Sequence, residues 1–129
     1  MADDTGQALF IDNCSGCHQL GGVGQPGLAP PLIDGPLWEN LGPRSPDYLA
    51  GVLVGGLTGT ISAGGQTFIG LAMPPQDWMT DAEMQAVADY VLNELNGLDA
   101  DLTLDTFAAA RAAPLSHAEL RAQRKEASP

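Results

Sequence analysis

The sequence predicts an all-α fold in a single domain, with one small β-hairpin as the exception. The chain has 129 residues, which is the length of one ordinary domain. Stretches with helix-start signals and apolar residues at helical spacing recur along it. Sixteen glycines, ten prolines and few aromatic residues (three Phe, two Trp, two Tyr) imply much loop and a modest core. Such a chain folds more readily when a large apolar cofactor forms part of its core.

The first predicted helix begins near residue 4, where Asp3 or Asp4 can cap it. Gly6, Phe10 and Cys14 follow at i, i+4 and i+8, so they share one face of that helix. Glycine inside a helix costs about 1 kcal/mol relative to alanine. We therefore expect another helix to approach closely at Gly6.

Cys14, Cys17 and His18 form a C-x-x-C-H motif with the only two cysteines of the chain. This is the attachment signature of a c-type haem. Two thiols on one side of a helical turn can add to the two vinyl groups, and the histidine can ligate the iron. A bare C-x-x-C also occurs in thiol oxidoreductases and zinc proteins. No strand is predicted before Cys14, so a haem-free thiol oxidoreductase is disfavoured.

The middle of the chain alternates loops with short elements. Residues 19–36 are rich in glycine and proline and form an irregular segment, although Leu28, Leu32 and Ile33 are apolar enough to line a pocket. Trp38 is expected in the core. Ser45 is the expected N-cap of a helix that stops at residues 55–56. Residues 60–62 and 66–68 flank a glycine turn and suggest a hairpin.

A second iron ligand is expected opposite the histidine, and Met73 is the best candidate. Two prolines follow it and hold it in a loop with no evident core role. Met1 is terminal, while Met79 and Met84 belong to the entry and the apolar stripe of the next helix. His117 is expected to be a solvated or capping residue.

Two further helical regions complete the chain. A capping box of Thr80 and Glu83 opens a helix that ends at residues 96–97. Beyond it, helices are expected at residues 103–113 and from Ser116, which forms a second capping box with Glu119. The predicted organisation is a haem domain, residues 1–97, and a helical extension, residues 98–129.

The charge is strongly negative, at −11. Through residue 110 there are 14 acids and one base, whereas four bases and two acids follow. The acidic part disfavours nucleic acid and suits redox protein partners with a basic docking patch, although solubility alone could explain it. No apolar run is long enough to span a membrane. Because this type of haem attachment occurs outside the cytoplasm, we expect a periplasmic mature chain whose leader was removed.

Residues 4–97 resemble the class I monohaem cytochromes c. The resemblance is carried by the C-x-x-C-H motif, by Pro30-Pro31-Leu32, by Met73-Pro74-Pro75 and by Gly6, Phe10 and Tyr90. It implies three to five helices around one covalently attached haem c, with first and last helices crossing at the glycine and the aromatic pair.

The resemblance also implies roles for single residues. Cys14 and Cys17 would form the thioethers, and His18 and Met73 would be the axial ligands. The carbonyl of Pro30 would accept the Nδ1–H of the haem histidine, with Leu32 beside it in the pocket. Because Pro31 is adjacent, the sequence alone does not decide which of the two prolines occupies that position.

The implied function is one-electron transfer with a periplasmic oxidoreductase, so the chain is expected to be an electron carrier and not an enzyme. The 32-residue tail leaves open a tightly bound subunit, or an excised haem domain, of a sulfite, alcohol or sugar dehydrogenase. A haem enzyme or gas sensor with an open iron is a further alternative, which requires that Met73 does not bind the iron.

Overall fold

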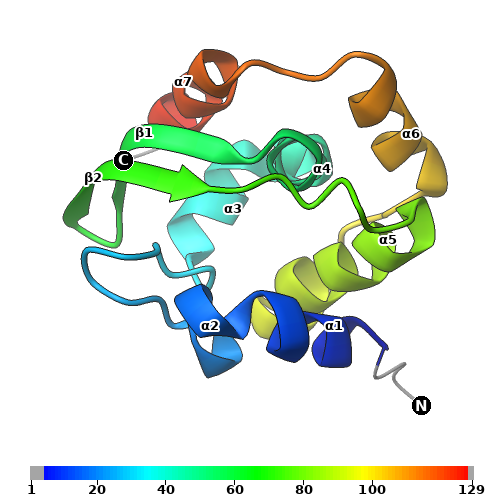
Figure 1. The fold of residues 1–129 in the computed structure, drawn as a ribbon, viewed down its shortest axis with the longest axis horizontal. Coiled ribbons are helices and arrows are strands. Elements are labelled where there is room, and N and C mark those ends of the chain that lie inside the picture. The colour runs from blue at the N-terminus through cyan, green and yellow to red at the C-terminus, as the bar shows by residue number, and fades with distance from the viewer. Residues whose placement is uncertain (1–4, 128–129) are drawn as a thin grey trace.

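The computed structural model describes residues 5–127 (Figure 1). The expected caps Asp3 and Asp4, and Met1, lie outside that range. The α-helices are α1 (Thr5–Asn13), α2 (Ser15–His18), α3 (Gly35–Leu41), α4 (Ser45–Gly55), α5 (Asp81–Asp89), α6 (Leu104–Ala112) and α7 (His117–Ala127). The strands are β1 (Leu57–Ala63) and β2 (Gln66–Met73), and the short helices are η1 (Leu20–Gly22), η2 (Gly42–Arg44) and the π-helical η3 (Tyr90–Leu95), which continues α5. The mainly helical fold with one hairpin is confirmed.

Helix α1 crosses α5 where the sequence places a glycine. A Cβ atom added to Gly6 would lie 2.1 Å from the carbonyl oxygen of Ala86, so a larger residue does not fit. Phe10 and Tyr90 pack beside this contact, with ring centroids 5.3 Å apart and planes tilted by 50°. The expected close approach of a second helix at Gly6 is therefore confirmed.

The hairpin is longer than the sequence pattern indicated. Strands β1 and β2 pair antiparallel from Ala63↔Gln66 at the turn to Leu57↔Met73 at the open end, with an irregularity between Gly59 and Ile61. Met73 was expected in a loop, but it is the last residue of β2, and the prolines end the strand there.

The prediction that Ser45 caps α4 was wrong. Helix η2 runs directly into α4, so the residue before Ser45 already has helical dihedral angles. The Ser45 hydroxyl instead donates to the carbonyl of Trp38 at 3.1 Å, in a buried setting. The two predicted capping boxes, at Thr80 and at Ser116, are present with both of their hydrogen bonds.

The tail returns across the rest of the fold. Helix α6 contacts α4 and α5, and α7 contacts α3, α4 and β1 (Figure 1). Phe107, Leu120 and Ala127 from these helices are buried in the same hydrophobic cluster as Phe10. The boundary between residues 97 and 98 stays a prediction, but the two parts share one core.

His117 was expected to be solvated or in a capping region, and its ring lies against the end of α4. Its Nε2 lies 2.8 Å from the carbonyl oxygen of Gly55, and its Nδ1 lies 2.8 Å from the Thr58 hydroxyl. The ring thus connects the start of α7 to the junction of α4 and β1. Across residues 5–127, the helices are too short or too polar for any of them to cross a bilayer.

Candidate haem site

All six site residues predicted from the sequence line one cavity. Cys17 and His18 lie on α2, with Cys14 directly before it, and Met73 ends β2 on the hairpin. Pro30 and Leu32 come from the loop between η1 and α3. The remaining wall is mostly apolar side chains: Phe10, Leu28, Ala29, Trp38, Leu49, Val52, Leu53, Leu57, Ile61, Leu71, Val87 and Val91.

His18 is held in one orientation. Its Nδ1 lies 3.0 Å from the carbonyl oxygen of Pro30, which can only accept, so Nδ1 carries the proton and Nε2 keeps a lone pair. Burial lowers the pKa of His18, the Pro30 bond opposes this shift, and the charge of Arg124 adds to the lowering. The residue is 8% exposed. A buried neutral imidazole with one nitrogen fixed suits metal ligation.

The loop that carries Pro30 is anchored through Leu32. The Leu32 carbonyl accepts from Trp38 Nε1 at 2.9 Å and from Asn96 Nδ2 at 2.8 Å. Asn96 also bonds the carbonyl of Val91 and accepts from the backbone N–H of Asp34. Sequence reasoning treated Asn96 only as a helix stop. Its side chain instead ties the end of η3 to the loop that orients His18.

The two thiols differ in their surroundings. Both are free; Cys14 is half-buried and Cys17 is exposed. Burial, with the neighbouring Cys17 thiolate, raises the pKa of Cys14 to about 11. Thiol oxidoreductases need the opposite, since their nucleophile works as a thiolate.

Met73 approaches the cavity at the open end of the hairpin, where the α4–β1 turn passes it closely. The residue is half-buried and packs against the core. Gly56, with φ of +73°, lies so near that an added Cβ would be 2.5 Å from the Met73 carbonyl oxygen. Only glycine readily adopts this positive φ and also leaves room for the Met73 carbonyl oxygen.

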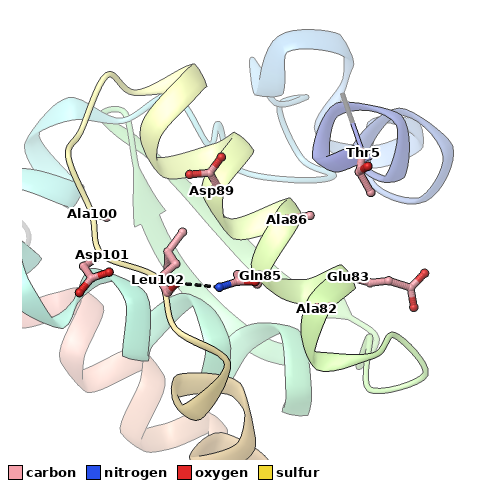
Figure 2. A pocket seen from close by; sticks show the side chains of 9 residues that line it. All are labelled: Thr5, Ala82, Glu83, Gln85, Ala86, Asp89, Ala100, Asp101 and Leu102. Carbon is pink, nitrogen blue, oxygen red and sulfur yellow. Dashed lines mark hydrogen bonds between the residues drawn. The ribbon is translucent and has the colours of Figure 1, made fainter. Parts of the chain in front are cut away.

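A second cavity lies elsewhere and has a different character. It is lined by residues of α5 and of the segment at Ala100–Leu102, with Thr5 opposite (Figure 2). The carboxylates of Glu83, Asp89 and Asp101 point in different directions around it, and Gln85 Nε2 donates to the Leu102 carbonyl at 2.7 Å. Among residues 5–127, none that lines it has a thiol, an imidazole or a thioether. It offers nothing that a haem would bind.

The first cavity has the chemistry that a haem c needs. It combines a mostly apolar wall, two thiols, an oriented neutral imidazole and a thioether. Among the polar residues of its wall that sequence reasoning did not assign to the site are Tyr48 and Arg124. Neither could be found from local pattern, because they are 76 positions apart and meet only in the fold.

Comparison with known proteins supports the same conclusion. The model of the family described as cytochrome c matches residues 4–94. The chain belongs to the cytochrome c family. This family binds haem c covalently through the C-x-x-C-H pattern that Cys14, Cys17 and His18 present, so the predicted cofactor is confirmed. Its members transfer electrons and are not enzymes.

Two similar proteins are both named cytochrome c-552 and come from Thermus thermophilus. One is 36% identical over 85 residues, which cover 65% of this chain and 63% of that protein. The other is 35% identical over 92 residues, which cover 70% of this chain and 60% of that protein. The match thus spans less than two thirds of either relative.

Proposed function

We propose that this cytochrome is a one-electron carrier whose haem c is bonded to Cys14 and Cys17 and ligated by His18 and Met73. The observation that carries the proposal is that one apolar cavity gathers the two thiols, the oriented imidazole and the thioether. A bound haem c supplies a one-electron iron couple. The surrounding residues orient the iron ligands and set the polarity of the cavity.

Each residue has a distinct task in this proposal. The carbonyl of Pro30 fixes the tautomer of His18 and raises the basicity of its Nε2. The thioether of Met73 would supply the second iron ligand, which would leave no position for a substrate. A neutral ligand and an apolar wall disfavour the extra positive charge of the oxidised state, so both raise the reduction potential.

Electron exchange is expected where the cavity reaches the surface. Cys17 is exposed, and Leu28, which lines the cavity, is half exposed. A small, transient contact with a redox partner at this edge would bring the two centres close. We propose a periplasmic setting, because covalent attachment to this motif normally takes place outside the cytoplasm.

Two alternatives make different predictions. The chain could be a tightly bound cytochrome subunit or haem domain of a sulfite, alcohol or sugar dehydrogenase, and then it would co-sediment stably with that enzyme. It could also have an open iron and act as a haem enzyme or gas sensor. Rapid carbon monoxide binding at neutral pH would support that second alternative.

The experiment that tests the ligand set uses the haem-loaded protein. Oxidised protein with a methionine ligand shows a weak sulfur-to-iron charge-transfer band at the red end of the visible spectrum. Met73→Ala is expected to abolish this band and to let carbon monoxide bind rapidly. Met79→Leu, a buried core change elsewhere, is expected to keep the band. If the band survives in Met73→Ala, the assignment of Met73 is wrong.

A further inference from the structure

Arg124 of α7 lies inside the haem cavity, although it comes from the tail beyond the part of the chain that matches the family model. The residue is 6% exposed. Its Nη1 donates to the Tyr48 hydroxyl at 3.2 Å, and its Nε donates to the Ser62 carbonyl at 3.4 Å. A guanidinium stays protonated in proteins, so this wall of the cavity carries a permanent positive charge.

That charge favours a negative group in the occupant. Among the described residues that line the cavity, Arg124 carries the only permanent charge. A cation in apolar surroundings is stabilised when an anion shares its site. The planar fork of a guanidinium matches a carboxylate, which it can bind through two parallel hydrogen bonds. A haem carries two such carboxylates, its propionates.

The position of Arg124 also agrees with the orientation that the two thiols impose. In a haem, the propionates are on the edge of the ring opposite the vinyl groups. Cys17 lies on α2, and α7 lies at the opposite end of the molecule, with the hairpin and α3 between them (Figure 1). If Cys14 and Cys17 bond the vinyl edge, the propionate edge therefore points toward α7.

We propose that Arg124 binds a haem propionate and that Tyr48 positions its guanidinium. This inference rests on the proposed haem attachment at Cys14 and Cys17. It gives the C-terminal extension a task that electron carriage alone does not explain, because α7 then supplies part of the cofactor site. The pair would keep one propionate ionised, so its charge would stay constant over a wide range of pH.

The surroundings contain few other groups that could titrate with the propionate. The other ionisable side chains lining the cavity are Cys14, Cys17, His18 and Tyr48. Strands β1 and β2 contribute no charged side chain. On the remaining elements packed against α7, Glu39 of α3 and Asp47 of α4 are exposed, as is Arg44 of η2, which pairs with Glu126. The other charged or titratable residues of α7 itself are His117, Glu119, Arg121, Lys125 and Glu126, none of which lines the cavity.

The test compares Arg124→Gln with Arg121→Gln in the haem-loaded protein. Arg121 is on the same helix and donates to the Thr58 carbonyl outside the cavity, so it controls for loss of one positive charge. The reduction potential is measured from mildly acidic to mildly alkaline pH. In the unchanged protein the potential should be nearly independent of pH. In Arg124→Gln it should match that value at the acid end, where the variant's propionic acid is protonated and neutral. As pH rises and that acid ionises, the potential of Arg124→Gln should fall below that of the unchanged protein. Arg121→Gln should show only a small offset that is independent of pH.

Two further variants and an infrared measurement distinguish a specific role of Arg124 from a purely structural one. Arg124→Lys retains the charge and should restore most of the flat profile, which a purely structural role of the arginine would not predict. Tyr48→Phe should give an intermediate profile. If Arg124→Gln does not fold, infrared difference spectra of the unchanged protein still decide the question, since a propionate held by Arg124 shows no protonated-acid carbonyl band at mildly acidic pH.

Contrary results have distinct meanings. Equal, pH-independent offsets in both glutamine variants, or a protonated-acid band for both propionates in the unchanged protein, would overturn the role of Arg124. The charge-transfer band of the methionine ligand should persist in every variant. Its absence from the unchanged protein would contradict the proposed function instead.

Discussion

Gly6 of α1 faces the carbonyl oxygen of Ala86 on α5 so closely that a methyl group cannot be placed between them. Gly6→Ala should therefore destabilise the folded protein, by about 1–3 kcal/mol if the helices separate slightly to make room. Chemical denaturation followed by circular dichroism measures the loss. Gly35→Ala is the matched control, since nothing lies within 4 Å of its added Cβ, and it should change stability little. Equal losses in both variants would mean that the helix crossing is not responsible.

A second glycine pair tests how Met73 is positioned. Gly56 and Gly65 both have a positive φ, of +73° and +78°, so alanine is strained at each. Only at Gly56 would the added Cβ strike the Met73 carbonyl. Gly56→Ala should weaken the methionine charge-transfer band of the oxidised protein, whereas Gly65→Ala should leave it unchanged. An intact band in Gly56→Ala would show that Met73 does not depend on this contact.

Arg111 joins the tail to the segment that leads from Met73 into α5. Its Nε lies 2.7 Å from Asp81 Oδ1, its Nη1 donates to the Asp77 carbonyl at 2.9 Å, and its Nη2 donates to the Met79 carbonyl. Because several charge-assisted bonds depend on one side chain, Arg111→Ala should cost about 2 kcal/mol of unfolding free energy.

Arg44 provides the comparison for that variant. Its ion pair with Glu126 is longer, at 3.6 Å, and both side chains are well exposed. Arg44→Ala should change the denaturation midpoint little, by no more than about 0.5 kcal/mol in free energy. If the two arginine variants were equally unstable, the network at Arg111 would contribute no more than an ordinary surface pair.

The acidic surface predicts how the carrier meets its partner. With 16 acids and five bases, electron exchange with a basic partner should slow as salt rises from low to physiological concentration. Stopped-flow absorbance with a basic and an acidic redox protein measures this dependence, and the acidic one should show the opposite slope. A rate with the basic partner that is flat in salt would leave solubility as the reason for the charge.

Local signals in the sequence predicted the local structure well. The capping box at Thr80 and Glu83 depends on residues three positions apart, so its pattern is readable directly. Spacing also placed Gly6 and Phe10 on one helix face. The prediction for Ser45 was wrong, because serine followed by proline indicates a helix start only when no helical turn precedes it. Here the helical turn η2 directly precedes Ser45.

Contacts between distant residues were not predictable in this way. Asn96 anchors Leu32 across 64 positions, and Arg124 meets Tyr48 across 76. No spacing rule relates such pairs, since the path of the chain between them decides whether they meet. The six predicted site residues line one cavity nonetheless. Their roles toward the haem stay predictions.

The return of α7 to the cavity has a consequence for the order of maturation. The C-x-x-C-H motif lies near the start of the chain, whereas the wall opposite it is completed by Met73 and finally by Arg124. Contacts of such long range form late, because the intervening chain must first be ordered. A chain emerging from its amino end therefore presents both thiols while the cavity is still open. Under the proposed attachment, haem insertion and bonding would precede closure, and docking of α7 would then cover the cofactor.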